Sequence, residues 1–249
     1  MNSAELITYL DTYLNTSSIQ DASQNGLQAE GPDTVMKAAF AVDGSLATIE
    51  AAAKEKADIL IVHHGIFWDR PVRATGPLYK RMKALIEGRL ALYASHLPLD
   101  LHAEVGNNAV IAKRLGVNDL VPFGSYHGVS IGWGGTLPSP TGLSQLMTSF
   151  TELTQSPCSF IDCGRDCSRV AIVSGGGASL LDEAARSGYD TFITGETSHS
   201  SYHYALEHGV NMIFGGHYAT ERFGVKALME HVKNSFGIDT VFIDIPTGM

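Results

Sequence analysis

Histidines and carboxylates that could bind a metal ion follow several short apolar runs of this 249-residue chain. The clearest case is His63 and His64, which come directly after four aliphatic residues, 59–62, and before Gly65. Such a run is typical of a buried strand, and open α/β sheets bind ligands beyond the carboxyl ends of their strands. Two imidazoles there indicate a metal site, and a histidine pair in a polar loop is the plainer alternative. Because neighbours on a strand point to opposite faces, we expect the chain to leave strand geometry at this pair, which Gly65 permits.

A histidine and a carboxylate stand four residues apart in two later segments. His217 and Glu221 lie in a stretch with helical periodicity, so their side chains should share one helix face and could share a metal cluster. His96 and Asp100 have the same spacing, but Pro98 between them indicates a loop rather than a helix. We therefore predict that Asp100 is a ligand, and that His96 supports the ligands or lines the substrate pocket.

The predicted ligands are three imidazoles and two carboxylates: His63, His64, Asp100, His217 and Glu221. A mononuclear zinc site ordinarily uses three protein ligands, whereas five nitrogen and oxygen donors suit two cations about 3.5–4 Å apart. We predict a dinuclear centre with two divalent metal ions per subunit. The donors favour Zn, Fe, Mn, Co or Ni over copper(I) and do not choose among these five.

Glu196 and His199 follow another short apolar run, residues 191–194, and are candidates for catalysis. A glutamate beside two cations could orient or deprotonate a bound water, and a histidine could protonate a leaving group. The alternative is a capped helix N-terminus with a histidine that faces solvent. Three glycines, 175–177, could cradle a phosphate, but they lack a lysine and a complete dinucleotide fingerprint, so a tight β-α turn explains them better.

The elements that must position these residues form a repeated pattern. Residues 38–42 predict a strand, 46–55 a helix and 59–62 the next strand, which together make a parallel β-α-β unit. A shift of the sequence by 132 positions superimposes this unit on residues 171–194. We infer an internal duplication, in which each copy is an α/β repeat with a small, mostly parallel sheet flanked by helices.

The boundary between the repeats is expected near residues 125–130. The first repeat, 1–127, carries three predicted ligands, and the second, 128–249, carries Glu196 with the other two. The C-terminal segment could pack back on the first repeat.

Three local features flank this pattern. The chain opens on an amphipathic helix over residues 4–15, with Ser3 as its N-cap. A glycine- and proline-rich stretch over 132–140 predicts a turn-rich connector, and a helix follows over 141–150.

Composition narrows the class of protein. The chain is 44% hydrophobic and 17% charged, as soluble globular proteins are, and its net charge of −9 disfavours nucleic acids and anionic membranes as partners. It has no apolar stretch of roughly 20 residues and no signal-peptide pattern, so we expect a cytoplasmic protein without a membrane partner. Its three cysteines are better explained as reduced thiols than as a disulfide framework or a zinc knuckle.

The motifs in their order resemble the family of Nif-three-like proteins, whose members are often labelled GTP cyclohydrolase 1 type 2 homologues. The resemblance spans almost the whole chain and rests on Asn25-Gly26-Leu27-Gln28, Val62-His63-His64-Gly65 with Phe67-Trp68, the segment 95–100, Thr194-Gly195-Glu196 with His199, Gly216-His217 with Glu221, and the ending 242–246. It implies a dinuclear metal centre held by the five predicted ligands, two intertwined α/β repeats, and a toroidal homohexamer whose metal sites face an internal cavity.

Two functions from different classes are compatible with these residues. The first is a metal-dependent hydrolase, in which a water between two cations attacks an unknown small substrate while Glu196 or His199 moves protons. The family label alone would make this activity a GTP cyclohydrolase. The second is a non-catalytic protein that stores, delivers or senses metal, or that serves as a ring-shaped scaffold.

Overall fold

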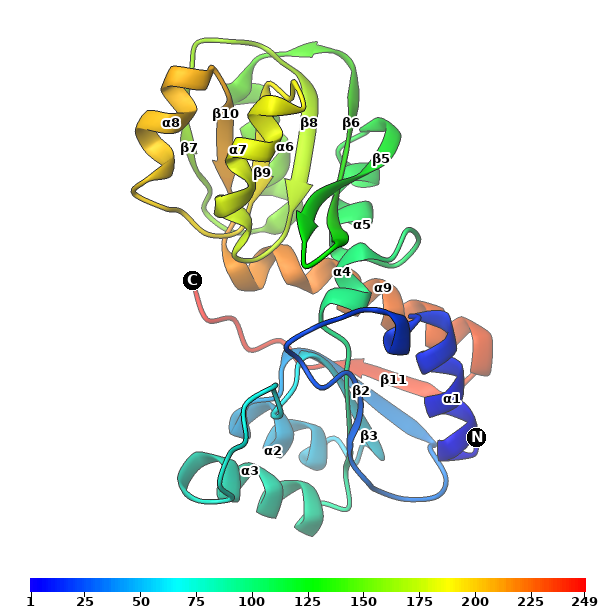
Figure 1. The fold of residues 1–249 in the computed structure, drawn as a ribbon. Coiled ribbons are helices and arrows are strands. Elements are labelled where there is room, and N and C mark those ends of the chain that lie inside the picture. Colours follow the sequence, from blue (N-terminus) through cyan, green and yellow to red (C-terminus); the bar gives the residue numbers. More distant parts are fainter. The chain divides into compact units, whose positions relative to one another are not determined.

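The computed structural model describes residues 1–249, and the chain folds into two compact units (Figure 1). The first unit comprises Met1–Val105 and Val225–Ile245, and the second comprises Gly106–Gly224 and Pro246–Met249. The first unit is therefore built from two separate stretches of the chain.

The first unit contains a five-stranded sheet in the order β1-β4-β3-β2-β11. Strand β1 runs antiparallel to β4, and all other neighbours are parallel. The strands are β1 (Gly26–Ala29), β2 (Lys37–Asp43), β3 (Ile59–His64), β4 (Ala91–Ala94) and β11 (Asp239–Phe242). The helices are α1 (Ser3–Tyr13), η1 (Thr16–Ser18), α2 (Leu46–Lys54), α3 (Gly76–Glu87), α4 (Leu97–Leu101) and, from Val225 onward, α9 (His217–Phe236).

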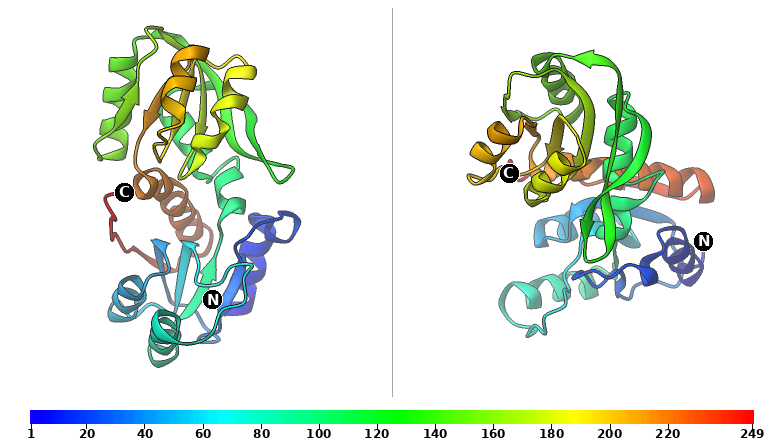
Figure 2. Two further views of the ribbon diagram at one scale, coloured as in Figure 1. Left: turned by 60° about the vertical axis from the view of Figure 1, so that its left-hand side comes forward. Right: turned by 45° about the horizontal axis from the view of Figure 1, so that its top comes forward.

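Strand β3 is buried on both faces, as its apolar run predicts. Ile59 and Ile61 pack with residues of α1 and α9, whereas Leu60 and Val62 pack with residues of α2 and α3. Figure 2 shows these helices around the first sheet. Because alternate residues of a strand face opposite sides, this arrangement leaves the strand ends as the place where β3 can expose functional groups.

The second unit contains a six-stranded sheet in the order β5-β6-β8-β9-β10-β7. Strands β8, β9 and β10 are parallel, and β5, β6 and β7 are each antiparallel to their neighbours. The strands are β5 (Asn118–Tyr126), β6 (Val129–Thr141), β7 (Ser159–Ile161), β8 (Cys167–Val173), β9 (Thr191–Thr194) and β10 (Asn211–Phe214). The helices are α5 (Asn107–Arg114), α6 (Leu143–Thr154), η2 (Gly177–Leu180), α7 (Leu181–Arg186), α8 (Ser201–His208) and the start of α9.

Each unit contains three parallel strands joined through helices, β2-β3-β4 in the first and β8-β9-β10 in the second. The sequence shift that superimposes 38–42 on the later repeat maps β2 on β8. This confirms the predicted class of two α/β repeats, each with a mixed sheet flanked by helices, and it fits an internal duplication.

The chain changes units at 105/106 and at 224/225, whereas the sequence pattern divided it at 127/128. Residues 106–127 form α5 and β5, and β5 pairs with β6 from Asn118 opposite Thr136 to Tyr126 opposite Val129. The duplication pattern covers only the strands and helices that repeat, so it carries no signal for the elements that flank them.

The segment predicted as a turn-rich connector, 132–140, belongs instead to the long strand β6, and that prediction was wrong. Its glycines serve close packing within the sheet. A Cβ atom on Gly132 would collide with the carbonyl oxygen of Ile172, and one on Gly134 would collide with the ring of Tyr189. These glycines are required because neighbouring atoms leave no room for a side chain, not because the chain turns there.

The N-terminal helix differs from its prediction at its first residue. Asn2, rather than Ser3, caps α1, because its side-chain oxygen accepts hydrogen bonds from the backbone N–H groups of Ala4 and Glu5. The predicted helix over 141–150 corresponds to α6, and the three cysteines are free thiols, as predicted. None of the helices combines the length and the apolar character needed to cross a bilayer.

Candidate metal centre

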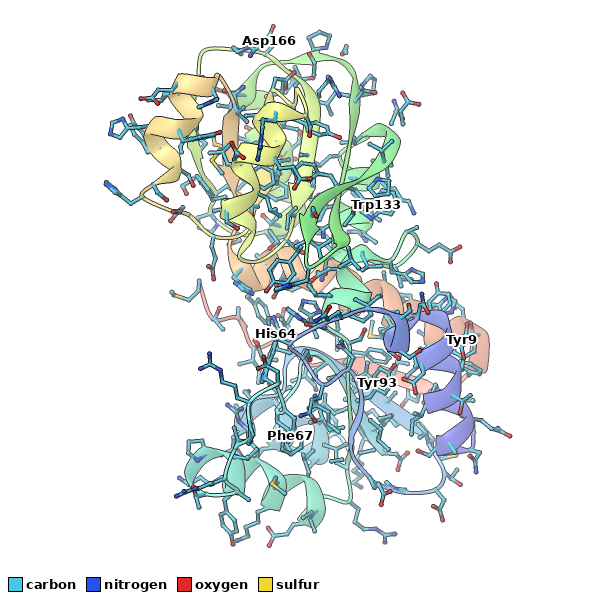
Figure 3. The ribbon with its side chains drawn as sticks, viewed as in Figure 1. Tyr9, His64, Phe67, Tyr93, Trp133 and Asp166 are labelled. Atoms are coloured by element: carbon cyan, nitrogen blue, oxygen red, sulfur yellow. The ribbon has the colours of Figure 1, made fainter.

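Polar groups gather at the carboxyl ends of the parallel strands of the first sheet. His64, labelled in Figure 3, ends β3. It lies directly opposite Asp43 at the end of β2, and Ser95 and His96 follow β4. This edge is where open α/β sheets place their ligands.

His63 and His64 both belong to β3, so the expectation that the chain leaves strand geometry at this pair was wrong. Their ring centroids nevertheless lie 4.6 Å apart. The alternation of faces applies to Cβ atoms, and long side chains at an open strand end can lean toward each other. His63 is fully buried, and Nδ1 of its ring lies 3.0 Å from the carbonyl oxygen of Ser95. Nδ1 of His64 lies 2.9 Å from Oδ1 of Asp43.

Gly65, which follows the pair, fits tightly against Gln28. A Cβ atom at position 65 would collide with the side-chain amide of Gln28. That amide accepts hydrogen bonds from the backbone N–H groups of Ile66 and Phe67, at 2.7 and 3.2 Å. The glycine therefore lets Gln28 of β1 hold the loop that leaves this edge of the sheet.

His96 is oriented by Asp21, a residue that sequence analysis missed. Nδ1 of His96 lies 2.9 Å from Oδ1 of Asp21, whose side chain is only 2% exposed. Burial alone would raise the pKa of Asp21, but hydrogen bonds from His96, Asn25 and the backbone of Ser23, with the charge of His96, lower it to about 2. The carboxylate is thus a charged acceptor over the whole neutral range.

Asp100 lies on the short helix α4, whereas the sequence predicted a loop between His96 and Asp100. Proline is tolerated because Pro98 occupies the first turn, where its missing N–H group has no partner to lose. The backbone N–H of Asp100 donates to the carbonyl of His96 at 3.2 Å. The carboxylate is buried, and its Oδ2 atom lies 3.5 Å from Nε2 of His63.

Three imidazoles of the first unit form one cluster. His63, His64 and His96 each offer a ring nitrogen, and these atoms all lie within 4.8 Å of one another. The cluster includes His96, predicted as a supporting or pocket residue, whose ring centroid lies 5.1 Å from that of His63 and 5.6 Å from that of His64. Trp68 packs beside it, with its ring edge-on to that of His96 at a centroid distance of 5.2 Å.

The second unit has donors of its own at the start of α9. His217 and Glu221 lie one turn apart, and Nε2 of His217 is 2.9 Å from Oε1 of Glu221. Their predicted placement on one helix face is confirmed. Nδ1 of the same ring lies 2.6 Å from Oε1 of Glu196, which follows β9. Glu221 is buried, with a side chain 4% exposed, whereas that of Glu196 is 53% exposed.

The charge of His217 follows from these two carboxylates. The hydrogen bond to Glu221 raises the pKa of His217 to about 9 against the opposing effect of burial, and Glu196 adds to the rise. The metal-free ring is thus an imidazolium at neutral pH. A proton on Nε2 occupies the place that a cation would take between this nitrogen and Glu221.

The three glycines after β8 form a tight turn beside this pair. Gly175 has a positive φ of 63°, and a Cβ atom there would collide with Oε1 of Glu221. Its carbonyl oxygen accepts hydrogen bonds from the N–H groups of Gly195 and Glu196, at 3.0 and 2.9 Å. The turn therefore positions Glu196 and leaves room for the carboxylate of Glu221.

His199, the other predicted catalytic residue, lies in the exposed loop between β9 and α8. Its side chain takes part in no hydrogen bond or ion pair. The structure therefore brings Glu196 to His217 and leaves His199 apart from that pair.

One feature unites the four imidazoles at the two sheet edges: each Nδ1 atom meets an oxygen acceptor. The acceptors are the Ser95 carbonyl for His63, Asp43 for His64, Asp21 for His96 and Glu196 for His217. Such partners favour a proton on Nδ1, so that Nε2 of the three first-unit rings can bind a metal, whereas at His217 a cation would have to replace the Nε2 proton that faces Glu221. The donor sets therefore fit divalent cations that prefer nitrogen and oxygen ligands.

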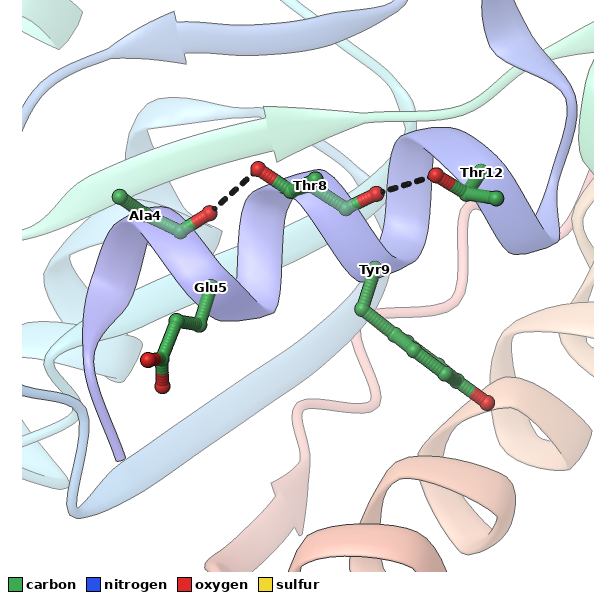
Figure 4. A pocket seen from close by; sticks show the side chains of 5 residues that line it. All are labelled: Ala4, Glu5, Thr8, Tyr9 and Thr12. Carbon is green, nitrogen blue, oxygen red and sulfur yellow. Dashed lines mark hydrogen bonds between the residues drawn. The ribbon is translucent and has the colours of Figure 1, made fainter.

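The hollow along α1 offers no comparable chemistry (Figure 4). It measures about 490 Å³ and is lined by Ala4, Glu5, Thr8, Tyr9 and Thr12. The hydroxyl groups of Thr8 and Thr12 donate to carbonyl oxygens of the helix itself, each at 2.8 Å. With a single carboxylate and no imidazole, this hollow is not a metal site.

The sequence and the fold of this chain are similar to those of known proteins. The profile of the Duf34/NIF3 (NGG1p interacting factor 3) family matches residues 1–248. A Deinococcus radiodurans protein named GTP cyclohydrolase 1 type 2 homolog is 47% identical over 246 residues, covering 98% of this chain and 94% of that protein. A protein of the same name from Archaeoglobus fulgidus is 44% identical over 250 residues, covering both chains completely. A crystal structure of a protein from Thermus thermophilus has a TM-score of 0.93 and 43% identity, again covering both chains completely.

Proposed function

The chain belongs to the Duf34/NIF3 family, and from that premise we propose that it binds two divalent cations and uses them to hydrolyse a small molecule. One observation carries the proposal: the imidazoles at the two sheet edges have their Nδ1 atoms bonded to oxygen acceptors, which prepares their Nε2 atoms for metal.

The proposed ligands are the five residues that spacing indicated: His63, His64, Asp100, His217 and Glu221. Three come from the first unit and two from the second, at the carboxyl ends of strands that the duplication relates. Five nitrogen and oxygen donors, with a carboxylate able to bridge, suit a pair of cations better than one. When bound, such a pair supplies a water molecule acidic enough to react at neutral pH and a Lewis acid for a substrate oxygen.

The residues around the ligands have distinct tasks. Asp43 and the Ser95 carbonyl hold His64 and His63 in one tautomer, and the buried Asp100 places a negative charge beside His63. Glu196 accepts the Nδ1 proton of His217 with Oε1, while Oε2 makes no hydrogen bond. That second oxygen can accept a proton from a water molecule and so act as a general base. His199, in the next loop, is the candidate for protonating a leaving group.

The name of the relatives directs the choice of first substrates. These relatives are named GTP cyclohydrolase 1 type 2 homolog, so GTP belongs in any initial screen of this chain. The free thiols of the cysteines suit action in the reducing cytoplasm.

The test combines metal analysis with a broad hydrolase screen. Purified protein should contain divalent metal by mass spectrometry, and it should turn over at least one substrate class with Zn, Fe, Mn, Co or Ni. Glu196→Gln should keep the metal content and lower kcat by roughly 10²- to 10⁴-fold, the usual contribution of a general base. The matched control is Glu207→Gln, because Glu207 is exposed on α8 and should leave both measurements unchanged.

A second candidate function, metal storage or delivery without catalysis, is favoured by the positions of the two proton-transfer candidates. Oε1 of Glu196 is already bonded to His217, and the exposed side chain of His199 makes no hydrogen bond that would hold it beside that pair. A protein that binds metal with all five ligands but turns over no substrate with any of these metals would support this second function and contradict the first.

A further inference from the structure

Positive charge is concentrated in one segment of the first unit, which consists of helix α3 and the residues on either side of it. Residues 69–89 contain six of the 17 lysines and arginines of the chain and only two carboxylates, so this segment has a net charge of +4. Because the whole chain carries −9, the remaining residues carry −13. The six cationic residues are Arg70, Arg73, Lys80, Arg81, Lys83 and Arg89.

Only one of these six cations has a partner within the protein. Nζ of Lys83 lies 3.7 Å from Oε1 of Glu87, one turn later on α3, and both side chains are more than half exposed. The side chains of the other five make no hydrogen bond and no ion pair with the chain, and all of them except Arg81 are exposed. Their charge is therefore available to neutralise the carboxylates of another molecule.

Apolar side chains are exposed among these cations. Tyr79 and Ile86 of α3 are 56% and 72% exposed, and Val72 in the preceding loop is exposed as well. Lys83 follows Tyr79 by four residues and precedes Ile86 by three, so these three side chains form one stripe along the helix. In Figure 1, α3 lies at the outside of the first unit beside α2.

We propose that this outer face of α3, with the loop before it, binds an acidic segment of a partner protein that carries apolar side chains at helical spacing. The carboxylates of the partner would pair with the guanidinium and ammonium groups, and its apolar side chains would cover Tyr79 and Ile86. Tyrosine and arginine are enriched among the residues that contribute most to binding at protein interfaces, and this segment contains one tyrosine and four arginines.

An anionic membrane fits this surface less well than an acidic protein segment does. A helix that lies on a bilayer presents a broad apolar face to the lipid. The broad apolar face of α3 is used inside the first unit, where Leu85 is buried and Leu78 and Met82 pack against the same core. Only two apolar side chains of α3 point outward, which is too few to enter a bilayer.

A nucleic acid fits less well because its charge is dense and continuous. The −13 on the remaining residues repels such a polyanion more strongly than it repels a short peptide with a few carboxylates. The aliphatic side chains of Val72 and Ile86 also offer no ring on which a base could stack.

The experiment uses the full-length protein and a fluorescein-labelled synthetic peptide of about 15 residues, with leucines on one helix face and glutamates on the other. Fluorescence anisotropy measures its Kd in about 0.1 M NaCl, and binding should weaken in about 0.5 M NaCl because salt screens the charges. Lys80→Glu should raise Kd by about 3- to 10-fold, since it removes one attraction and adds one repulsion. Lys233→Glu makes the same change at an exposed lysine of α9 and should leave Kd nearly unchanged.

A second pair of variants tests the apolar part of the surface. Ile86→Ser should raise Kd about fivefold, as loss of an apolar contact at an interface does. Met36→Ser, at an exposed methionine of the same unit, is the control and should bind the peptide like the wild type. Circular dichroism of all four variants should match that of the wild type.

Each outcome supports or overturns the proposal. A wild-type protein that does not bind the peptide, or equal Kd values for Lys80→Glu and Lys233→Glu, would overturn it. Labelled oligothymidine or phosphatidylserine vesicles that bind more tightly than the peptide, and that lose affinity with Lys80→Glu, would assign the surface to a nucleic acid or a membrane instead. None of these variants changes a proposed metal ligand, so the result is independent of the proposed hydrolase activity.

Discussion

Each imidazole at the candidate centre owes its orientation to an oxygen atom from another part of the chain. The partners of His63 and His64 come from the ends of neighbouring strands, and the partner of His96 comes from a loop 75 residues earlier. A neutral imidazole binds metal through one nitrogen only when the proton is fixed on the other. The acceptors should therefore contribute to the metal affinity of the proposed site.

Asp43 offers the simplest test of this dependence. Asp43→Ala should lower the affinity of the proposed site for divalent metal by about 10- to 100-fold, because the His64 ring loses the acceptor that fixes its tautomer. A competition titration against a chromogenic chelator measures the change. Asp33→Ala, at an exposed aspartate of the same unit, is the control, and equal affinity in both variants would contradict the prediction.

His217 should make the stability of the metal-free protein depend on pH. Its pKa rises from an ordinary 6.5 to about 9, chiefly through the hydrogen bond to Glu221. A raised pKa means that the stabilising contribution is complete below pH 6.5 and is lost as the pH rises through 9. The Tm of chelator-treated wild type should therefore exceed that of His217→Gln at about pH 6, and the difference should shrink by about pH 9.5. A Tm difference that stays constant over this pH range would show that the ion pairs of His217 do not contribute to the stability of the metal-free protein.

Spacing and strand ends in the sequence indicate the ligands, but not the groups that orient them. His217 and Glu221 follow from helical periodicity alone. Asp43 could have been found as well, since parallel neighbours such as β2 and β3 end together. Asp21 could not, because nothing in its local sequence shows that a loop carries it to His96.

The glycines of β6 and the proline of α4 predict loops in the sequence, but both elements are regular secondary structure. Gly132 and Gly134 lie inside strand β6, where neighbouring atoms leave no space for a side chain. Pro98 lies in the first turn of α4, where the backbone does not need its N–H group. A glycine in a strand or a proline in a first turn looks the same in the sequence as one in a loop, and only the packing around it decides.

Gly132 is a direct test of that packing. Gly132→Ala should destabilise the protein by about 1–3 kcal/mol, because the new methyl group would collide with the backbone of Ile172 on the paired strand. For a chain of this length such a loss lowers Tm by several degrees in a thermal melt. Ser130→Ala changes an exposed position of the same strand and should leave Tm nearly unchanged. Equal melting of the two variants would mean that β6 can move away from β8 at little cost.

The duplication could be read from the sequence, and the return of the C-terminal segment to the first repeat was expected as a possibility, but the residues at which the chain changes units could not be predicted. The repeated β-α-β pattern predicts two sheets of related topology, and both are present. The return of Val225–Ile245 to the first unit depends on β11 pairing with β2 and on Leu228 and Val232 packing in its core. These are long-range contacts, for which a single sequence carries no periodic signal.

Self-association is the last property expected of the whole molecule. The sheet of the second unit ends in two edge strands, and each exposes an apolar side chain: Val121 on β5 is 50% exposed and Phe160 on β7 is 49% exposed. Exposed apolar edges of this kind favour contact with further copies of the chain.

We expect a homohexamer, with the mass of about six chains of 26.7 kDa each in light scattering after size exclusion. Val121→Lys should lower that mass, whereas Val72→Lys, at an exposed loop valine of the first unit, should not. A wild-type protein with the mass of a single chain would contradict the assembly, and it would leave the metal ligands of each unit to be tested on their own.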